Sequence, residues 1–375
     1  MSDKPRLLMI GRTRYRLPLN ESLQAKFDAL AERFEVRVLA SGVAGAPRRD
    51  AMFELAGPWK PRRLDGAAYF LTLPFRTRRE LRTTPPHAVL VQGAHETWFV
   101  LLGRSLSGTR PRVILDVHGD WRSSTRLYGS PARRLLSPIA DRVALSAVRR
   151  ADAVRTISDY TTGLVRSYGV EPAAVFPAFM DLDPFLGPTV PLPSAPRVLF
   201  VGVLEHYKGI DELAEAWRIV AARVPDATLH LVGRGTRHEV AARLVAELPA
   251  RTEWTEVLPT ESVARALDAA TVLVLPSRSE GMGRVIVEAF CRARPVLGSR
   301  VGGIPDLVED GRNGLLVEPG DTAALVDALV RVLTDRELAE RLAAAAHAST
   351  EFWTSSPQEF ASRVRALVER IAGLR

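Results

Sequence analysis

The chain has 375 residues, of which 46% are hydrophobic and 25% are charged. This composition is typical of an ordinary soluble globular protein, and the length exceeds that of a usual single domain. No apolar run approaches the roughly 20 residues of a membrane span. The N-terminal segment MSDKPRLLMIGRTRYRL also lacks the apolar stretch and cleavage site of a signal peptide. We therefore expect a cytoplasmic location.

The formal net charge of +8 indicates an anionic partner. Nucleotide phosphates, anionic lipid headgroups and nucleic acid all satisfy this condition, so charge alone does not choose among them. The single cysteine, Cys291, has apolar neighbours, which favours a buried side chain over a reactive thiol.

Short β-rich runs alternate with amphipathic segments along the whole chain, which predicts parallel sheets covered by helices. In the first half the expected strands are residues 7–10, 36–40, 88–91, 113–117 and 153–157, and the expected helices include 21–34 and 133–149. Six prolines between Pro177 and Pro196 interrupt the pattern. Such a segment cannot continue a helix or a central strand, so we interpret it as a linker between two domains.

The same pattern restarts after the linker. The expected strands are residues 198–203, 228–232, 272–275, 296–298 and 315–317, and the expected helices are 211–223, 239–247, 263–269, 322–333 and 357–374. Two consecutive doubly wound α/β domains result. In such sheets ligands bind beyond the carboxyl ends of the strands.

The most informative segment is residues 272–290, VLVLPSRSEGMGRVIVEAF. A buried strand is expected to end at Leu275, a polar loop follows, and a helix begins near Gly283. Free backbone N–H groups at the helix start favour an anion. Gly281 and Gly283 allow the backbone to approach a ligand closely.

Glu280 and Glu288 flank the start of this helix. Two unrelated surface carboxylates are the simplest interpretation, but Glu288 lies in an apolar stretch and needs partners. A glycosidase pair is another interpretation, with carboxyls roughly 5 to 9.5 Å apart. Eight residues of helix rise by about 12 Å, which is better suited to holding two parts of one long ligand, such as sugar and ribose hydroxyls.

The segment resembles the retaining glycosyltransferases of family 4, which have the GT-B fold and carry an E-x7-E motif in this context. The likeness continues in the segments VGVLEHYKG at 201–209, LVGRG at 231–235, LPSRSEGMG at 275–283, PVLGSRVGGIPDLVEDGRNGLLVEPGD at 295–321, DVHG at 116–119 and FMDLDPF at 179–185. It implies two Rossmann-like domains facing each other across a cleft. The acceptor-side domain would be residues 1–185 with a returning helix at 356–375, and the nucleotide-sugar domain residues 186–355.

The resemblance also implies roles for individual residues. Glu280 would contact the transferred sugar, Glu288 the ribose and Lys208 the diphosphate, while His118 would lie near the reacting centre. Without the resemblance, we would interpret Lys208 as a turn residue and His118 as a structural or exposed residue. The remaining donor-binding candidates are Gly281, Met282, Gly283, Arg284, Gly11 and Arg234.

A fixed lysine and a helix N-terminus can stabilise a departing diphosphate, so no metal is expected. No cofactor is expected either, apart from a UDP- or GDP-linked donor substrate. The acceptor would be a carbohydrate, a lipid-linked molecule or a small molecule in glycoconjugate, polysaccharide or natural-product biosynthesis.

The chain departs from the family pattern at three places. Val203 stands where relatives often have Arg, and Arg234, Arg284 or the N-terminal Arg12, Arg14 and Arg16 are candidates to replace it. The segment GRTRYRLPLN at 11–20 replaces a pair of glycines, which affects the expected acceptor contacts. Arg294 replaces a common glycine, and we expect this change to affect only the turn.

Several other functions fit parts of the pattern. An epimerase or phosphorylase of the same architecture is the nearest, whereas an oxidoreductase is disfavoured because neither Gly202 nor Gly233 begins a GxGxxG motif. The arginines of residues 12–16 and 76–81 could form a nucleic-acid surface. However, no aromatic-interleaved binding module accompanies them, so we expect no nucleic acid. The same arginines could bring the protein to the inner face of an anionic membrane, as a peripheral contact.

Overall fold

The computed structural model describes residues 4–61, 64–122 and 131–374 of the chain. The chain divides into two compact units, Met1–Phe179 with Ser355–Arg375, and Met180–Thr354. The domain boundary expected from the sequence, between residues 185 and 186, lies in the same proline-rich region. Each unit has its own parallel sheet and its own buried core.

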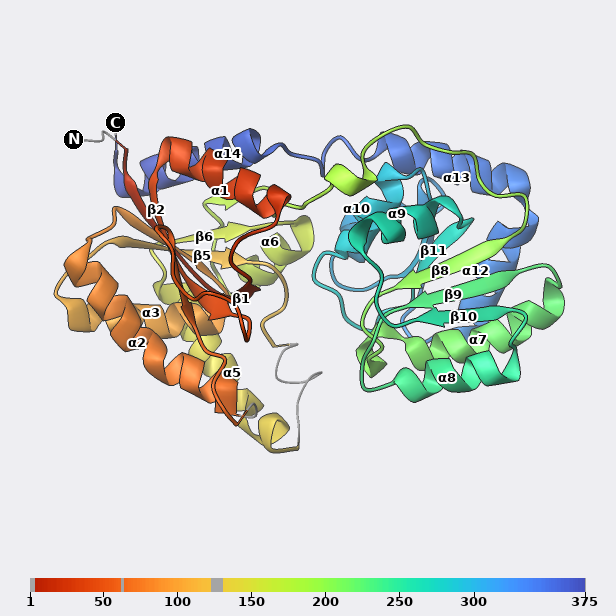
Figure 1. Ribbon diagram of the computed structural model, residues 1–375, viewed down its shortest axis with the longest axis horizontal. Helices are drawn as coiled ribbons and strands as arrows, with labels where there is room; N and C mark the ends of the chain where they lie inside the picture. The colour runs from red at the N-terminus through yellow and green to blue at the C-terminus, as the bar shows by residue number, and fades with distance from the viewer. Residues whose placement is uncertain (1–3, 62–63, 123–130, 375) are drawn as a thin grey trace. The chain divides into compact units, whose positions relative to one another are not determined.

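The described part of the first unit contains a seven-stranded sheet in the order β3-β2-β1-β4-β5-β6-β7 (Figure 1). The strands are β1 (Arg6–Tyr15), β2 (Glu35–Gly42), β3 (Phe53–Ala56), β4 (Ala88–Gln92), β5 (Arg112–Val117), β6 (Ala153–Thr156) and β7 (Ala174–Val175). The helices are α1 (Glu21–Arg33), α2 (Asp65–Thr83), α3 (Ala94–Ser107), α5 (Pro131–Arg150), α6 (Asp159–Arg166) and α14 (Pro357–Ala372). All five expected strands are confirmed.

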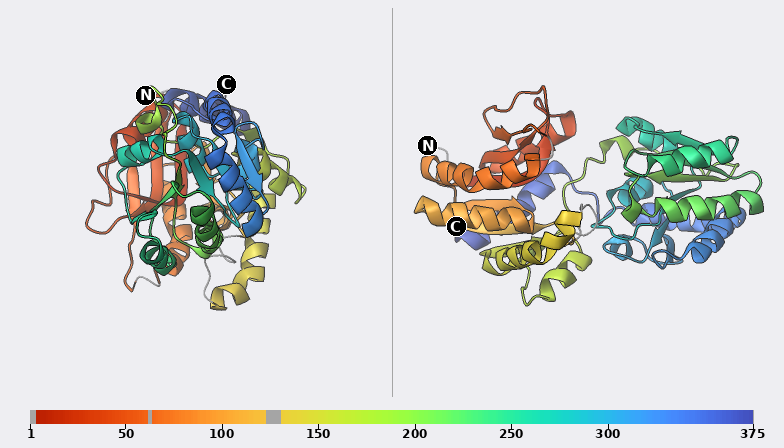
Figure 2. Two further views of the ribbon diagram at one scale, coloured as in Figure 1. Left: turned by 90° about the vertical axis from the view of Figure 1, so that its right-hand side faces the viewer. Right: turned by 90° about the horizontal axis from the view of Figure 1, so that it is seen from below.

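Helices cover both faces of this sheet (Figures 1 and 2). A hydrophobic core lies on each face of the sheet, and successive residues of β1 alternate between them. Leu7 packs with α1 and α14, whereas Leu8 packs with α2 and α3. This explains why the strands are apolar on both faces. Arg365 of α14 donates a 2.6 Å hydrogen bond to the carbonyl oxygen of Arg33. The last helix therefore returns to the first unit, as expected.

The described part of the second unit contains a six-stranded parallel sheet in the order β10-β9-β8-β11-β12-β13 (Figure 1). The strands are β8 (Arg197–Val201), β9 (Thr228–Val232), β10 (Thr252–Thr255), β11 (Val272–Leu275), β12 (Val296–Ser299) and β13 (Gly314–Val317). The helices are α7 (Ile210–Arg223), α8 (His238–Glu247), α9 (Thr260–Asp268), α10 (Arg284–Cys291), α11 (Ile304–Leu307), α12 (Thr322–Thr334) and α13 (Arg336–Ala348), with 3-10 turns η2 (Asp183–Phe185) and η3 (His206–Lys208).

The strand order reverses between β8 and β11 in the second unit and between β1 and β4 in the first. At such a switch the loops that follow the two neighbouring strands turn to opposite faces of the sheet and leave a crevice at its carboxyl edge. The loops after β8 and β11 carry Lys208 and Glu280. The topology of the second unit thus places these two residues at one edge.

Arg294 was expected to affect only the turn in which it lies. Its buried side chain also holds the linker to the second unit in place. Its side chain is almost fully buried, and Ala293 before it has a φ of 53°. The guanidinium donates to carbonyl oxygens of the linker and of the end of α9, namely those of Val190, Pro191, Leu267 and Asp268, at 2.7 to 3.2 Å. A glycine could make none of these bonds.

Candidate functional site

The loop after β8 is pressed against the loop after β11. Gly209 ends the η3 turn with a φ of 71°, and a Cβ at this position would lie 1.9 Å from the carbonyl oxygen of Pro276. Only a glycine permits this conformation and this approach together. The backbone N–H of Arg278 donates to the carbonyl of Tyr207 at 2.7 Å, and the Arg278 guanidinium pairs with Glu212 of α7, with Nε 2.7 Å from Oε1. The two loops are therefore fixed to each other.

Lys208 and Glu280 meet across these loops. The Lys208 ammonium forms an ion pair with the Glu280 carboxylate, and their side chains are only 15% and 13% exposed. Glu280 Oε1 also accepts a 3.3 Å hydrogen bond from the backbone of Gly281, and Ser277 Oγ lies 3.5 Å from Oε2. The structure thus brings together two of the residues that the sequence singled out, although they are 72 positions apart.

The N-terminus of α10 lies directly after Glu280. Gly283, with a φ of 73°, is its cap residue, and no side chain accepts a hydrogen bond from the first turn at the cap. N–H groups at such a helix start are suited to an anion. Met282 is buried, whereas Arg284 at the first helical position is exposed. Of these neighbours, Arg284 is the one whose side chain is open to a ligand.

Two further glycines, which the sequence analysis did not single out, support the Glu280 loop. A Cβ on Gly302 would lie 1.9 Å from the carbonyl oxygen of Glu280, and a Cβ on Gly303 would lie 2.2 Å from that of Gly281. The loop after β12 therefore packs directly against the backbone of the E-x7-E motif. The sequence signal was present as the GG pair in VGGIPD.

Glu288 lies farther along α10 and is separate from the Lys208–Glu280 pair. Within the described part of the chain, its carboxylate accepts no hydrogen bond from another side chain or from the backbone. Burial raises the pKa of Glu288 above its usual value, Arg284 opposes this rise and Asp181 adds to it. A half-buried carboxylate of this kind gains from a ligand that donates hydrogen bonds.

Arg234 is the candidate that lies beside Val203. The carbonyl oxygen of Arg234 accepts a 3.1 Å hydrogen bond from the backbone of Leu204, and both Arg234 and Val203 are exposed. The N-terminal candidates have other surroundings within the first unit. Arg14 forms an ion pair with Asp65 at 2.8 Å, and the Arg12 guanidinium lies 5.8 Å from the centre of the Phe70 ring.

Gly11 does not begin a loop, because β1 continues to Tyr15 with an irregularity between Ile10 and Arg14. The expected end of this strand at residue 10 was therefore wrong. A Cβ on Gly11 would lie 3.2 Å from both Cβ and Oε1 of Gln92. Gly11 thus provides space for the Gln92 side chain.

His118 lies one residue beyond β5 and is held by two side chains. Its Nε2 is 2.8 Å from Asp116 Oδ2, and its Nδ1 is 3.2 Å from Gln92 Nε2. Asp116 is also 2.6 Å from a guanidinium nitrogen of Arg155. Burial alone would raise the pKa of Asp116, but the charge of Arg155 and the hydrogen bonds donated by Arg155 and His118 hold it well below its usual value. This carboxyl is therefore ionised and can only accept hydrogen bonds.

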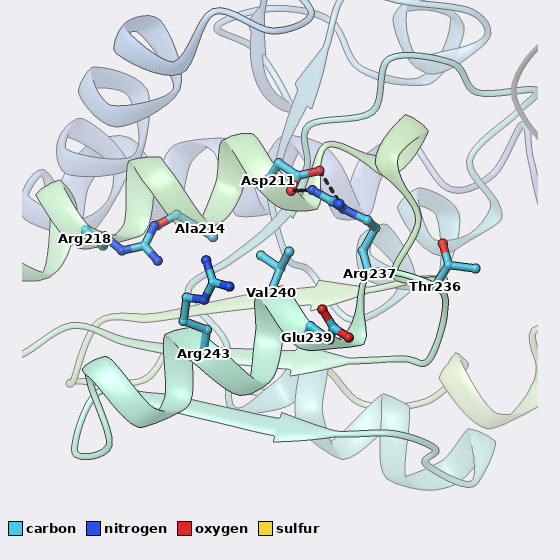
Figure 3. Close-up of a pocket in the computed structure, with 8 residues that line it drawn as sticks. All are labelled: Asp211, Ala214, Arg218, Thr236, Arg237, Glu239, Val240 and Arg243. Atoms are coloured by element: carbon cyan, nitrogen blue, oxygen red, sulfur yellow. Dashed lines mark hydrogen bonds and ion pairs between the residues drawn. The ribbon is translucent and has the colours of Figure 1, made fainter.

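A separate pocket of about 260 Å³ lies between α7 and α8 (Figure 3). Its lining residues are Asp211, Ala214, Arg218, Thr236, Arg237, Glu239, Val240 and Arg243. Arg237 is paired with Asp211, and Arg218 with Glu247. Two of its three arginines are thus already neutralised, and the pocket shares no lining residue with the Lys208–Glu280 pair.

The described ranges contain neither a metal-binding cluster nor a membrane-spanning helix. No group of three or more His, Cys, Asp or Glu side chains in residues 4–61, 64–122 and 131–374 is arranged to hold a metal ion. No helix in the same ranges is long and apolar enough to cross a membrane.

Two parallel Rossmann-like sheets, one in each unit, are the architecture of the GT-B fold. A family model described as "Glycosyltransferase Family 4" matches residues 26–184, and one described as "Glycosyl transferases group 1" matches residues 195–335. The chain belongs to glycosyltransferase family 4.

Individual relatives agree with this assignment. Alpha-D-kanosaminyltransferase of Streptomyces kanamyceticus is 28% identical over 88% of this chain and 86% of its own. Sulfoquinovosyl transferase SQD2 of Arabidopsis thaliana is 33% identical, but the match covers 42% of this chain and only 31% of that protein. Sucrose-phosphate synthase of Thermosynechococcus elongatus has the same fold, with a TM-score of 0.77, 22% identity and coverage of 97% of this chain and 100% of that one.

Proposed function

We propose that this glycosyltransferase moves a sugar from a nucleotide-diphosphate donor to an acceptor hydroxyl, with retention of the anomeric configuration and without a metal ion. The observation that carries the proposal is the contact of Lys208 with Glu280 beside the open N-terminus of α10. A cation, a carboxylate and free N–H groups at one edge of a sheet match a diphosphate linked to a sugar.

Donor binding would exchange the partners of the ion pair. The diphosphate would become the partner of Lys208, and Glu280 would then be available to accept hydrogen bonds from the sugar hydroxyls. Because both side chains are largely buried, neither can remain without a partner at low cost. The pair therefore keeps both charges satisfied until a ligand supplies new partners.

In the proposed reaction the bond from the anomeric carbon to the diphosphate oxygen breaks, and a bond to the acceptor oxygen forms on the same face. The acceptor's proton moves to the departing oxygen. Once Lys208 has exchanged Glu280 for the diphosphate, Lys208 and the N–H groups of α10 would stabilise the charge that develops on the departing oxygen. Glu288 is proposed to accept hydrogen bonds from the ribose hydroxyls, and Arg234 or Arg284 to supplement Lys208.

Two related proteins support a nucleotide donor. HepE of Anabaena, which shares the fold at 18% identity and a TM-score of 0.68, was solved with UDP and with UDP-glucose. A relative from Mycolicibacterium smegmatis, 30% identical over 62% of this chain, is described as a GDP-mannose-dependent mannosyltransferase that acts on a phosphatidylinositol monomannoside. We extend to this chain only the class of donor, UDP- or GDP-linked.

The proposed acceptor is a carbohydrate, a small molecule or a lipid-linked molecule, in glycoconjugate, polysaccharide or natural-product biosynthesis. For a lipid-linked acceptor we propose peripheral contact with an anionic membrane from the cytoplasm. The arginines of residues 76–81 contribute little to such contact, because Arg76 and Arg79 pair with Glu54 and Arg78 bonds to the carbonyl of Leu106. Arg12 and Arg16 are exposed and remain the candidates.

The experiment is a screen of UDP- and GDP-linked sugars by thermal shift, followed by transfer assays with an acceptor panel in the presence and absence of EDTA. We expect nucleotide release, EDTA resistance, and a product whose anomeric proton coupling in NMR matches that of the donor. A product of opposite configuration would contradict retention. Conversion of the nucleotide sugar alone would indicate an epimerase, a requirement for phosphate a phosphorylase, and a salt-sensitive gel shift without turnover a nucleic-acid-binding protein.

A further inference from the structure

Four side chains of the first unit lie in one row at the carboxyl ends of three neighbouring strands. Gln92 of β4 is in register with Asp116 of β5, and Asp116 is in register with Arg155 of β6. In-register residues of parallel strands project to the same face of a sheet, and so does a residue two positions farther along an extended chain. His118 follows Asp116 by two positions and contacts both Asp116 and Gln92.

The end of the row is a buried ion pair. The Arg155 side chain is 1% exposed and that of Asp116 is 10% exposed, and their nearest atoms are 2.6 Å apart. The other terminal nitrogen of Arg155 donates to the carbonyl oxygens of Phe176 and Pro177, at 2.8 and 2.7 Å. The guanidinium also stacks over the Phe176 ring at 3.8 Å. Asp116 is therefore fixed on one side by Arg155 and presents its other oxygen to His118.

The hydrogen bonds of the row are mutually consistent with one placement of the protons. Asp116 accepts, so the hydrogen of His118 lies on Nε2. Thr13 donates its hydroxyl to Gln92 Oε1 at 2.8 Å, which leaves the Gln92 amide N–H₂ facing Nδ1 of His118. An amide nitrogen can only donate, and Nδ1 must therefore be the acceptor. This is the neutral imidazole with its hydrogen on Nε2.

We propose that Asp116 and Arg155 are positioning residues that hold His118 as the neutral Nε2–H tautomer, with Gln92 selecting the same tautomer from the other side of the ring. Both ring nitrogens then have partners within the first unit. His118 presents a fixed, uncharged ring to the reaction and does not carry the acceptor's proton. The inference about the reaction rests on the proposed function, but the tautomer does not.

The first test is NMR of protein labelled with ¹⁵N-histidine, in which long-range couplings from the ring protons distinguish the two neutral tautomers from imidazolium. The His118 signals are assigned by their loss in His118→Asn. We expect the Nε2–H pattern at neutral pH in the ligand-free protein. An Nδ1–H or imidazolium pattern would overturn the proposal, whether or not sugar transfer is ever detected.

Variants test the role of each partner. Gln92→Glu replaces the donor that faces Nδ1 by an acceptor, and we expect the signals to change to the imidazolium pattern. Asp116→Asn should weaken the preference for Nε2–H but not abolish it, because Gln92 still donates to Nδ1. Since removing one partner of a buried pair can unfold a protein, the double variant Asp116→Asn with Arg155→Met provides a neutral replacement. An unchanged Nε2–H pattern in folded Gln92→Glu would contradict the assignment, as would an Nδ1–H pattern in the folded double variant, in which Gln92 still donates to Nδ1.

Asp120→Asn is the matched control, because Asp120 lies two positions on the other side of His118 and pairs with Arg122 instead. It should leave the His118 signals unchanged. In transfer assays Asp116→Asn should lower kcat by up to about 10²-fold, as expected for a misplaced group, with the donor KM within about twofold. An equal loss of kcat in Asp120→Asn would mean that the loss in Asp116→Asn comes from general destabilisation, and would contradict a positioning role.

Discussion

The Lys208–Glu280 pair and the Asp116–Arg155 pair are both buried ion pairs at the carboxyl edge of a parallel sheet, but they are built differently. Asp116 and Arg155 lie in register on neighbouring strands. Lys208 and Glu280 come from loops whose positions depend on glycines and on contacts between loops. The strand-borne pair is suited to remain unchanged during a reaction, whereas the loop-borne pair is suited to exchange its partners for those of a ligand.

The largest expected effect comes from breaking the loop-borne pair. Lys208→Ala and Glu280→Ala should each lower kcat by about 10² to 10³-fold, because each removes a group that stabilises the reacting ligand, worth on the order of 3 kcal/mol. Transfer kinetics of the purified variants measure this effect. Lys4→Ala, an exposed lysine of the first unit, is the control. Near-normal turnover in both folded variants would refute the proposed site.

A second prediction separates backbone strain from displacement of the Glu280 loop. Gly302 and Gly311 have φ values of 58° and 76°, so Ala at either position costs about 1 to 2 kcal/mol of backbone strain. At Gly302 the new Cβ would also overlap the carbonyl of Glu280, whereas nothing lies within 4 Å of a Cβ at Gly311. We expect both variants to lose thermal stability but only Gly302→Ala to lose transfer activity beyond tenfold. Equal transfer activity in Gly302→Ala and Gly311→Ala would show that the Glu280 loop tolerates the displacement, and would contradict this prediction.

A third prediction concerns the pH dependence of donor binding through Glu288. Only the ionised carboxylate accepts both ribose hydroxyls, so affinity should fall as the pH falls through the pKa of Glu288. Because burial and Asp181 raise this pKa, the fall should begin above the usual range of a glutamate near 4.3. Calorimetric titration with a nucleotide sugar from pH 5 to 8 measures it, and Glu288→Gln should remove the dependence. A flat profile in the unmodified protein would argue against ribose binding at this residue.

The smallest expected effect concerns Cys291. Burial raises the pKa of this thiol to about 11, and its side chain is almost fully buried on α10. Reaction with an aromatic disulfide at pH 8 should be slow in the folded protein and fast after denaturation. Inclusion of a nucleotide sugar should change the slow rate little. Rapid labelling of the native protein would mean that α10 opens readily.

Much of the fold followed from local sequence. The apolar runs that predict β1, β4, β5, β8 and β11 are buried on both faces, so their pattern was clear. The sequence did not predict β3, whose four residues include the charged Glu54, or α2, which contains Pro74 in its interior. Lys208, Glu280 and Glu288 were found through the resemblance to family 4, together with their places near predicted elements of the second domain.

Contacts between distant residues could not be predicted in the same way. The positions of Gln92, Asp116 and Arg155 are 24 and 39 residues apart, and only the sheet register makes them neighbours. The sequence drew attention to His118 but gave no indication of the side chains that hold it. Similarly, the basic segment at residues 76–81 was considered as a possible anion-binding surface, whereas all three of its arginines bind a glutamate or a carbonyl oxygen.

The linker illustrates why a count of basic residues is a poor measure of affinity for anions. Prolines lack an N–H group, so a proline-rich segment cannot form a ladder of backbone hydrogen bonds. Three arginines provide the missing donors: Arg292 binds the carbonyl of Pro188, Arg294 those of Val190 and Pro191, and Arg336 those of Leu192 and Pro193. Part of the excess positive charge therefore donates hydrogen bonds to carbonyl oxygens of an irregular backbone segment and not to an external anion. In related chains, the number of prolines in this segment and the number of arginines around it should rise and fall together.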